Sequence, residues 1–170
     1  MNLNAEDLYA KLLKQLRAEI KAPQGAIYLA GLAVGGAWIA ERLAKDLGLP
    51  SFGTVNVSFH RDDYAEKGLA AISSAGSMPT QLSFDVNGAH LVLIDDVLHT
   101  GRTVRAALNE LFDFGRPSKV SLMVLVDRQK RDLPITADFA ADTVELADHQ
   151  ILVLNKDQHG QFSFQLEKRS

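Results

Sequence analysis

The stretch LVLIDDVLHTGRTVRAAL, Leu91 to Leu108, decides the fold of this chain. Its first four residues, Leu91 to Ile94, are apolar and predict a strand buried on both faces, as in a parallel sheet. Two carboxylates, Asp95 and Asp96, follow at the carboxyl end of that strand, where open α/β sheets bind their ligands. The residues from Val104 to Phe114 have a helical pattern, so the sequence predicts a strand, a loop and a helix in succession.

The loop between this strand and this helix, HTGRT from His99 to Thr103, is rich in glycine and hydroxyl residues. Because it opens into a helix N-terminus, it offers unpaired N–H groups and the positive end of the helix dipole to a phosphate. The adjacent carboxylates upstream suit either Mg²⁺ or a pair of sugar hydroxyls. Taken alone, the Asp pair could also be a helix cap with surface charge. In this order, however, the parts predict a site for a phosphorylated ribose.

Two other phosphate-binding motifs are absent from the sequence, namely G-x-x-x-x-G-K-[ST] and a G-x-G-x-x-G that follows a strand. The arrangement instead resembles the signature of the type I phosphoribosyltransferases, which bind 5-phosphoribosyl-1-diphosphate (PRPP). This resemblance implies an α/β fold in which helices flank a mostly parallel, twisted sheet and a flexible hood or lid covers the site.

Three segments narrow the resemblance to the PyrR family of pyrimidine operon regulators. The run DDVLHTGRTVRAALNELFDFGRPSKV is similar to that family's DDVLYTGRTVRAALD and following GRPS, SFHRDD (Ser58 to Asp63) to its YRDD, and VDRQKRDLPITAD (Val126 to Asp138) to its DRGHRELPIRAD. The matches cover about residues 27–138. They imply a uracil phosphoribosyltransferase, a glycosyltransferase that converts uracil and PRPP to UMP and diphosphate. Some members of the family also bind pyr operon RNA and thereby regulate pyrimidine gene expression.

Composition predicts a single cytoplasmic domain. A chain of 170 residues that is 46% hydrophobic can bury one substantial core, so residues 1–170 are expected to form one domain. Without cysteine it can form neither disulfides nor thiolate metal sites. No apolar run approaches the roughly 18 residues of a membrane span, and the first residues are amphipathic rather than signal-like. A net charge of −3 gives no overall attraction to nucleic acid.

Strands and helices alternate along the rest of the chain. An amphipathic helix capped by Asn4 is expected to run to about Lys21. The other expected elements are strands at 26–32, 52–59 and 119–127, a helix at 37–47 and a terminal hairpin of 151–154 with 162–166. Residues 61–88 break the pattern with glycines, a proline and an Asn-Gly turn, which predicts a flexible loop or hairpin that could act as a lid. Residues 127–170 are expected to form a C-terminal hood with the terminal strands.

The reaction implied by the resemblance assigns roles to the motif. Positive charge develops on the ribose as diphosphate leaves, so the site must hold the 5-phosphate, fix the ribose and neutralise the diphosphate. We expect Asp95 and Asp96 to hold the ribose hydroxyls, with Mg²⁺ bound by these carboxylates or only through ribose or water. The loop from Thr100 to Thr103 is expected to hold the 5-phosphate. The expected PRPP-binding residues are therefore Asp95, Asp96, Leu98, His99, Thr100, Gly101, Arg102 and Thr103.

A second anion-binding loop, Gly31 to Gly36, follows the first expected strand and opens a helix, as a diphosphate site requires. Where the PyrR family commonly has Thr-Arg-Gly, this chain has Val34, Gly35 and Gly36, so a hydroxyl and a guanidinium are missing. The glycines still allow the backbone to approach an anion closely, or they only pack the helix against the sheet. This departure keeps open a third interpretation, a catalytically weak protein that binds PRPP or a nucleotide.

Candidates for contact with the base come from the same comparison. His99 replaces the family's common tyrosine, and it could act on a proton of the base near neutral pH or form only a local hydrogen bond. Arg128 and Arg131 lie where the family's base-binding hood begins. Arg61, at the start of the segment 61–88, could close over PRPP or form a surface ion pair. A purine base is the alternative substrate, because uracil comes only from the resemblance.

The alternative class of function is an RNA-binding regulator that uses the nucleotide site to sense UMP. Thr136 replaces the basic residue of the family's LPIRAD, which weakens this interpretation. The remaining cluster of basic residues is one helix face, which could equally be only solvated, made of Lys11, Lys14, Arg17 and Lys21. We also expect a homodimer or a larger homo-oligomer that does not bind membranes.

We predict that Thr100→Ala and Thr103→Val raise the KM for PRPP more than they lower kcat. The 5-phosphate is remote from the reacting C1 atom, so its contacts stabilise the bound substrate and the transition state to a similar extent. Steady-state kinetics with varied PRPP measures both parameters. If neither parameter changes, the phosphate is held elsewhere.

Overall fold

A parallel sheet of five strands forms the centre of the molecule, with the strand order β2-β1-β3-β4-β5. This architecture is given by a computed structural model, which describes residues 2–22, 25–57 and 79–170. In chain order the strands are β1 Ile27–Leu32, β2 Gly53–Val55, β3 His90–Leu98, β4 Lys119–Asp127 and β5 Phe139–Thr143. Strand β3, which carries the Asp pair, is the central strand. Because it lies between β1 and β4, both of its edges are hydrogen-bonded to neighbours.

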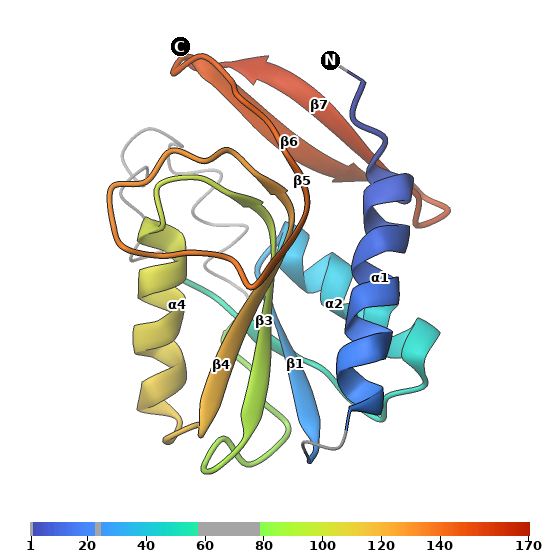
Figure 1. The fold of residues 1–170 in the computed structure, drawn as a ribbon, viewed down its shortest axis with the longest axis vertical. Coiled ribbons are helices and arrows are strands. Elements are labelled where there is room, and N and C mark those ends of the chain that lie inside the picture. The colour runs from blue at the N-terminus through green and yellow to red at the C-terminus, as the bar shows by residue number, and fades with distance from the viewer. Residues whose placement is uncertain (1, 23–24, 58–78) are drawn as a thin grey trace.

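Helices cover both faces of the sheet (Figure 1), which confirms the α/β fold with a parallel sheet. The helices α1, Ala5–Lys21, and α2, Gly35–Leu47, lie on one face, and α4, Arg102–Asp113, lies on the other. Successive residues of β3 point to opposite faces, so Val92 joins the core beneath α1 and α2 while Leu93 joins the core beneath α4. Fully burying one such side chain stabilises the fold by about 1.5–3 kcal/mol.

A two-stranded antiparallel hairpin lies across the end of the sheet (Figure 1). Its strands are β6, Gln150–Lys156, and β7, Phe162–Lys168. Leu152, Leu154 and Phe162 are buried in the same core as α1 and α2, so the hairpin is packed onto the domain through apolar contacts. The terminal hairpin predicted from the sequence is confirmed, with slightly longer strands.

The boundaries of three predicted elements differ from those in the structure. Strand β3 continues to Leu98, so Asp95 and Asp96 lie within the strand and not after it. Helix α2 begins at Gly35, two residues before the predicted start, because the glycines form its first turn. Strand β5 was not predicted; it is a short edge strand whose residues are half-buried or exposed and therefore lack a clear apolar pattern.

The predicted strand at 52–59 is reduced to Gly53–Val55, and its last two positions lie outside the described residues. The same holds for Arg61 and for most of the expected lid, since residues 58–78 are not described. The remainder of that segment, 79–88, is irregular as predicted. It is attached to the sheet by an antiparallel bridge between Gln81 and Thr54.

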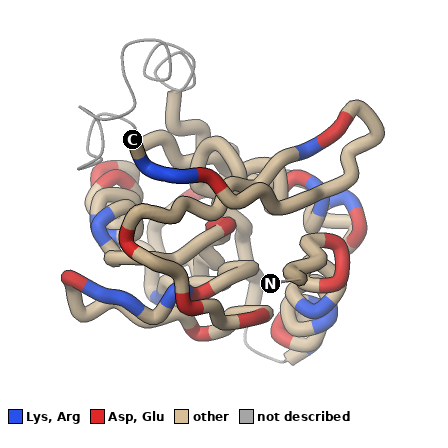
Figure 2. The backbone as a smooth tube through the Cα atoms, turned by 90° about the horizontal axis from the view of Figure 1, so that it is seen from above, with Lys and Arg blue, Asp and Glu red and all other residues tan. Residues whose placement is uncertain are grey.

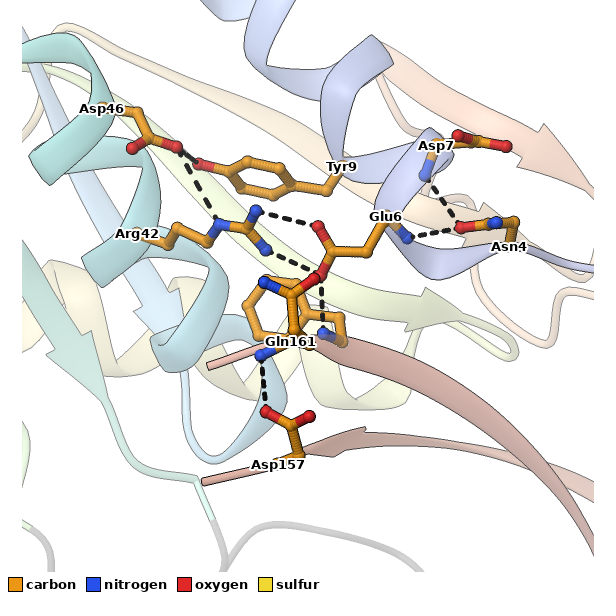
Figure 3. A network of polar contacts seen from close by, with 9 residues as sticks. Asn4, Glu6, Asp7, Tyr9, Arg42, Asp46, Asp157 and Gln161 are labelled. Atoms are coloured by element: carbon orange, nitrogen blue, oxygen red, sulfur yellow. Dashed lines mark hydrogen bonds and ion pairs between the residues drawn. The ribbon is translucent and has the colours of Figure 1, made fainter. Parts of the chain in front are cut away.

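A network of polar contacts ties α1, α2 and the hairpin together (Figure 3). Arg42 of α2 donates two hydrogen bonds of 2.8 Å, one to each carboxylate oxygen of Glu6 on α1. Glu6 Oε1 also accepts a hydrogen bond of 2.6 Å from the backbone N–H of Phe162, at the start of β7. Beside this pair, Tyr9 donates to Asp46 at 2.6 Å. Glu6 therefore joins three elements that are far apart in the sequence.

Electrostatics make this junction dependent on pH. The hydrogen bonds from Arg42 lower the pKa of Glu6, and the backbone N–H of Phe162 acts in the same direction against the cost of burial. A carboxylate whose pKa is lower in the folded state stabilises the fold fully above its unfolded pKa. That stabilisation is lost as the pH falls through the lowered, folded pKa. The relevant range therefore lies below about pH 4.5.

We predict that Glu6→Gln lowers the free energy of unfolding at pH 7 by about 1–2 kcal/mol, because it removes a bidentate, charge-assisted pair that is partly exposed. Urea unfolding measures the change. The loss should shrink when both proteins are compared below pH 4. Asp7→Asn is a matched control, because it removes a carboxylate from the same helical turn without touching Arg42. Equal losses in the two variants would contradict a specific role for Glu6.

Candidate active site

A pocket of about 670 Å³ opens between the carboxyl end of β3 and the hairpin. Parts of the chain that are distant in sequence form its walls. They are Ala33, Val34, Gly35 and Trp38, residues 95–104, Arg128, Asp132, residues 151–155 and Arg169. The structure thus brings together the Asp pair, the loop after it, the glycine loop and one of the two predicted base-binding arginines.

The two aspartates differ in their surroundings. Asp95 is buried, with 5% of its surface exposed, and its Oδ1 accepts the backbone N–H of Asp96 at 2.9 Å. Asp96 is half-buried, and its Oδ1 accepts the N–H of Val97 at 2.8 Å. These local bonds fix the orientation of both carboxylates at the pocket wall. Together they place negative charge and oxygen ligands at one side of the pocket.

The glycine loop lies directly against the Asp pair. A Cβ atom added to Gly35 would come within 2.5 Å of Asp96 Oδ2, and one added to Gly36 within 2.3 Å of the carbonyl oxygen of Ile94. At Gly36 the obstacle is backbone, so this position requires glycine, whereas a side chain at Gly35 would require the Asp96 side chain to move. The packing role of these glycines is therefore observed. Their second predicted role, binding an anion through backbone N–H groups, stays a prediction.

The loop after β3 reaches the first turn of α4 through Gly101, which has φ +91°. This left-handed conformation favours glycine. Thr100 Oγ1 accepts the N–H of Arg102 at 3.3 Å. The N-cap residue itself, Gly101, has no side chain with which to cap α4. Residues 100–104 line the pocket, so the first turn of α4 and the positive end of its dipole lie beside it, as an anion site requires.

The segment that follows β4 holds this loop in place from outside. Arg131 donates to the carbonyl oxygen of His99 at 2.8 Å, to that of Ile135 at 2.8 Å and to Asp127 Oδ2 at 2.7 Å. Arg131 is not among the residues that line the pocket described above. Its predicted contact with the base stays a prediction, whereas its observed contacts support the loop.

Arg128 lies inside the pocket wall, with only 5% of its surface exposed. Its Nη1 is 3.5 Å from Nδ1 of His99, and its Nη2 donates to the carbonyl oxygen of Ala147 at 3.3 Å. Burial lowers the pKa of His99, and the charges of Arg128, Arg169 and Lys130 lower it further. A local contact of the kind considered for His99 is thus present, and its surroundings favour the neutral imidazole.

Several residues of the pocket were missed by sequence reasoning. Trp38, residues 151–155 of β6 and Arg169 come from elements expected to form a helix face or a terminal hairpin, without an assigned role. The C-terminal end of the chain is basic (Figure 2) and brings Arg169 to the pocket. No local motif marks these residues, because the docking of the hairpin places them there.

The described residues contain no helix long and apolar enough to cross a membrane. They also contain no group of three or more His, Cys, Asp or Glu side chains that could hold a metal ion unaided. A metal at the Asp pair would thus take its remaining oxygen ligands from water or from a bound substrate, which is a usual arrangement for Mg²⁺.

Comparison with known proteins agrees with this geometry. Residues 2–153 match the family model described as phosphoribosyl transferase domain. A relative from Ralstonia nicotianae, named bifunctional protein PyrR, is 49% identical over 99% of this chain and 97% of its own length. A protein of the same name from Pseudomonas fluorescens is 44% identical over 86% of this chain and 88% of its own length.

Solved structures share the fold at low sequence identity. A hypoxanthine phosphoribosyltransferase from Staphylococcus aureus has a TM-score of 0.59 and 20% identity, over 84% of this chain and 76% of that chain. The hypoxanthine phosphoribosyltransferase of Trypanosoma cruzi, in complex with the product IMP, has a TM-score of 0.58 and 18% identity, over 89% of this chain and 82% of that chain. At this level of identity the likeness concerns the fold alone.

Proposed function

Since this chain belongs to the PyrR family of phosphoribosyl transferase domain proteins, we propose that it transfers the phosphoribosyl group of PRPP to uracil, giving UMP and diphosphate. The observation that carries this proposal is the meeting of three features around one pocket. These are the Asp pair of β3, the N-terminus of α4 and the glycine loop that opens α2. A ligand with a phosphate, a ribose and a diphosphate needs these three features side by side.

The 5-phosphate is assigned to the loop from Thr100 to Thr103. Backbone N–H groups at the start of α4 bind an anion without the entropy cost of ordering long side chains. The two threonine hydroxyls add donors, and Gly101 allows the turn that directs them inward. Because these contacts are remote from C1, they serve mainly to hold and orient the substrate.

The ribose hydroxyls are assigned to Asp95 and Asp96, whose carboxylates accept hydrogen bonds from a vicinal diol. Mg²⁺ suits the same residues, because it binds through one or two carboxylates together with substrate phosphates. When bound, the ion supplies positive charge that stabilises the leaving diphosphate. The carboxylates lie beside the carbon where positive charge develops, so they also stabilise the transition state.

The diphosphate is assigned to Val34, Gly35 and Gly36, which can offer only backbone N–H groups. The close contact between Gly35 and Asp96 supports this assignment, because it places the loop beside the proposed ribose site. The hydroxyl and guanidinium found in related loops are missing. We therefore expect slower turnover than in relatives that keep them. If turnover is very low, the protein acts mainly by binding PRPP or a nucleotide.

Regulation by RNA binding is a second proposed function. Two observations favour it: the relatives reported above are named bifunctional, and α1 presents an exposed basic face. That face consists of Lys11, Lys14, Arg17 and Lys21, opposite the buried leucines of the same helix. A pyr messenger RNA is the corresponding partner, with UMP as the ligand that controls binding.

We also propose that the protein acts in the cytoplasm as a homodimer or larger homo-oligomer. The absence of cysteine is compatible with a reducing compartment. Phe112 and Phe114, at the end of α4, expose 55% and 46% of their surface, which favours burial against another chain.

The proposed reaction is tested by PRPP- and Mg²⁺-dependent formation of nucleotide from a panel of free bases. Uracil should be the substrate that gives product, whereas product from hypoxanthine, guanine or adenine alone would replace uracil by a purine.

We predict that Asp95→Asn and Asp96→Asn each lower kcat/KM by about ten- to hundredfold, equivalent to roughly 1.5–3 kcal/mol for one charge-assisted contact.

Asparagine preserves the size of aspartate and its acceptor for the local backbone N–H, so both variants should fold like the wild type. Circular dichroism and thermal melting check this point. Wild-type turnover in either folded variant would remove that carboxylate from the proposed site. Asp85→Asn, on an exposed loop away from the pocket, serves as the matched control.

The second function generates its own prediction. Replacing Lys14, Arg17 and Lys21 together by glutamine should weaken binding of pyr leader RNA and reduce the slope of log K against log salt by up to about one unit per lost phosphate contact. Transferase activity should be nearly unchanged, because the basic face lies outside the pocket. A salt titration with and without UMP measures both effects. Absence of RNA binding by the wild type would leave only the enzyme.

A further inference from the structure

We propose that His99 recognises the oxo oxygen at position 4 of uracil through its Nε2–H group, and that Arg128 fixes the imidazole in this donor form. The proposal rests on the proposed transfer to a free base. It goes further by assigning His99 to recognition instead of proton abstraction. It also restricts the substrate class to bases with an oxo group at this contact, in place of an amino group.

The first step concerns the ring nitrogen that faces Arg128. A guanidinium donates hydrogen bonds and accepts none. Its Nη1 is 3.5 Å from His99 Nδ1, so this nitrogen must present its lone pair to Arg128. Turning the ring over would place a C–H group against the guanidinium, which loses the contact. Arg128 is itself buried and held by the carbonyl oxygen of Ala147, so it keeps its position.

The second step concerns the charge of His99. Among the described residues, the charged groups that act on His99 are three cations, Arg128, Lys130 and Arg169, and two carboxylates, Asp132 and Asp148. Burial disfavours the imidazolium, and the excess of cations does so as well. A second proton, on Nδ1, would also point at the guanidinium. The imidazole is therefore neutral, with its single proton on Nε2.

The third step concerns geometry. His99 lies in the pocket wall together with Ile151 and Val153 of β6, which offer an apolar surface suited to a planar base. The backbone of His99 is held by Arg131, which donates to its carbonyl oxygen at 2.8 Å. Among the residues that the structure describes, none donates to or accepts from His99 Nε2, so this ring nitrogen is left for a ligand, and in this tautomer it donates.

Two consequences follow for the reaction. A general base needs a free lone pair, and the lone pair of His99 is used by Arg128, so His99 does not take a proton from the base. An Nε2–H group complements an oxo oxygen, whereas an amino group would place two donors face to face. The site should prefer uracil to cytosine and, among purines, hypoxanthine or guanine to adenine.

Titration calorimetry with UMP and CMP tests this recognition without any turnover, since the two nucleotides share O2 and differ at position 4 of the base, an oxo group in UMP and an amino group in CMP, together with the proton on N3 of UMP. The wild type should bind UMP at least about tenfold more tightly than CMP. His99→Gln places an amide donor near the position of Nε2 and should keep most of this preference. His99→Asn places its amide near Nδ1 instead, and should lose it.

Arg128→Met tests the positioning role, because it removes the group that fixes the ring without removing the ring. This variant should lose the preference for UMP while its binding of CMP changes little. Thermal melting confirms folding of each variant. If Arg128→Met does not fold, the contrast between His99→Gln and His99→Asn still decides the proposal, because these two variants are matched in chemistry and differ by one methylene.

Kinetics separate recognition from base catalysis. If His99 is a donor, His99→Gln should keep kcat with uracil within a few-fold of the wild type; if it is a general base, kcat should fall by about 10²–10⁴-fold. Equal affinity of the wild type for UMP and CMP, or equal losses in the Gln and Asn variants, overturns the proposal. A wild type that makes no UMP from uracil would instead refute the proposed function, and the nucleotide titration would still decide the role of His99.

Discussion

The close approach of α2 to the middle of the sheet is the constraint on which the site depends. At Gly36 a side chain would collide with the carbonyl oxygen of Ile94, and at Gly31 with the carbonyl oxygen of Gly36 itself. Backbone therefore lies against backbone at this point. Because the first turn of α2 touches β3 here, the glycine loop and the Asp pair form one continuous wall.

Negative and positive groups lie on different sides of the pocket. Asp95 and Asp96 provide acceptors on the side of the sheet, whereas Arg128, Arg169 and the helix N-termini provide positive charge around them. A substrate that carries both hydroxyls and phosphates is complementary to such a division. Each anion contact made by backbone N–H groups is already organised before binding, so little reorganisation is needed when charge develops on the ribose.

The hairpin completes the pocket from above, and its position depends on contacts far from the ligand. Glu6 and Arg42 join α1, α2 and the start of β7 through three hydrogen bonds. Two run from the guanidinium of Arg42 to the carboxylate of Glu6, and the third runs from the backbone N–H of Phe162 to the same carboxylate. The same α2 helix begins with the glycine loop. The first turn of α2 thus lines the pocket, and Arg42, further along the same helix, helps to hold the hairpin.

The sequence by itself determined most of the strands and helices, the parallel sheet and the loop Thr100–Thr103 that lines the pocket. Apolar periodicity and loops rich in glycine and hydroxyl residues are visible within short stretches of sequence, so these elements can be recognised without knowledge of the tertiary structure. The Asp pair was found for the same reason, although the strand proved longer than its apolar run. Strand β5 escaped notice, because an edge strand with one exposed side has little apolar pattern.

Only the tertiary structure decided which distant residues share the pocket. Trp38, the β6 residues and Arg169 enter it through packing of α2 and of the hairpin, which no short motif encodes. Arg128 and Arg131 are three residues apart and looked equivalent in the sequence, yet one lies in the pocket wall and the other supports the loop from outside. The tautomer of His99 likewise depends on a hydrogen bond across 29 positions of the chain. Such roles depend on three-dimensional contacts, because the partner of a side chain is set by the fold and not by its neighbours in sequence.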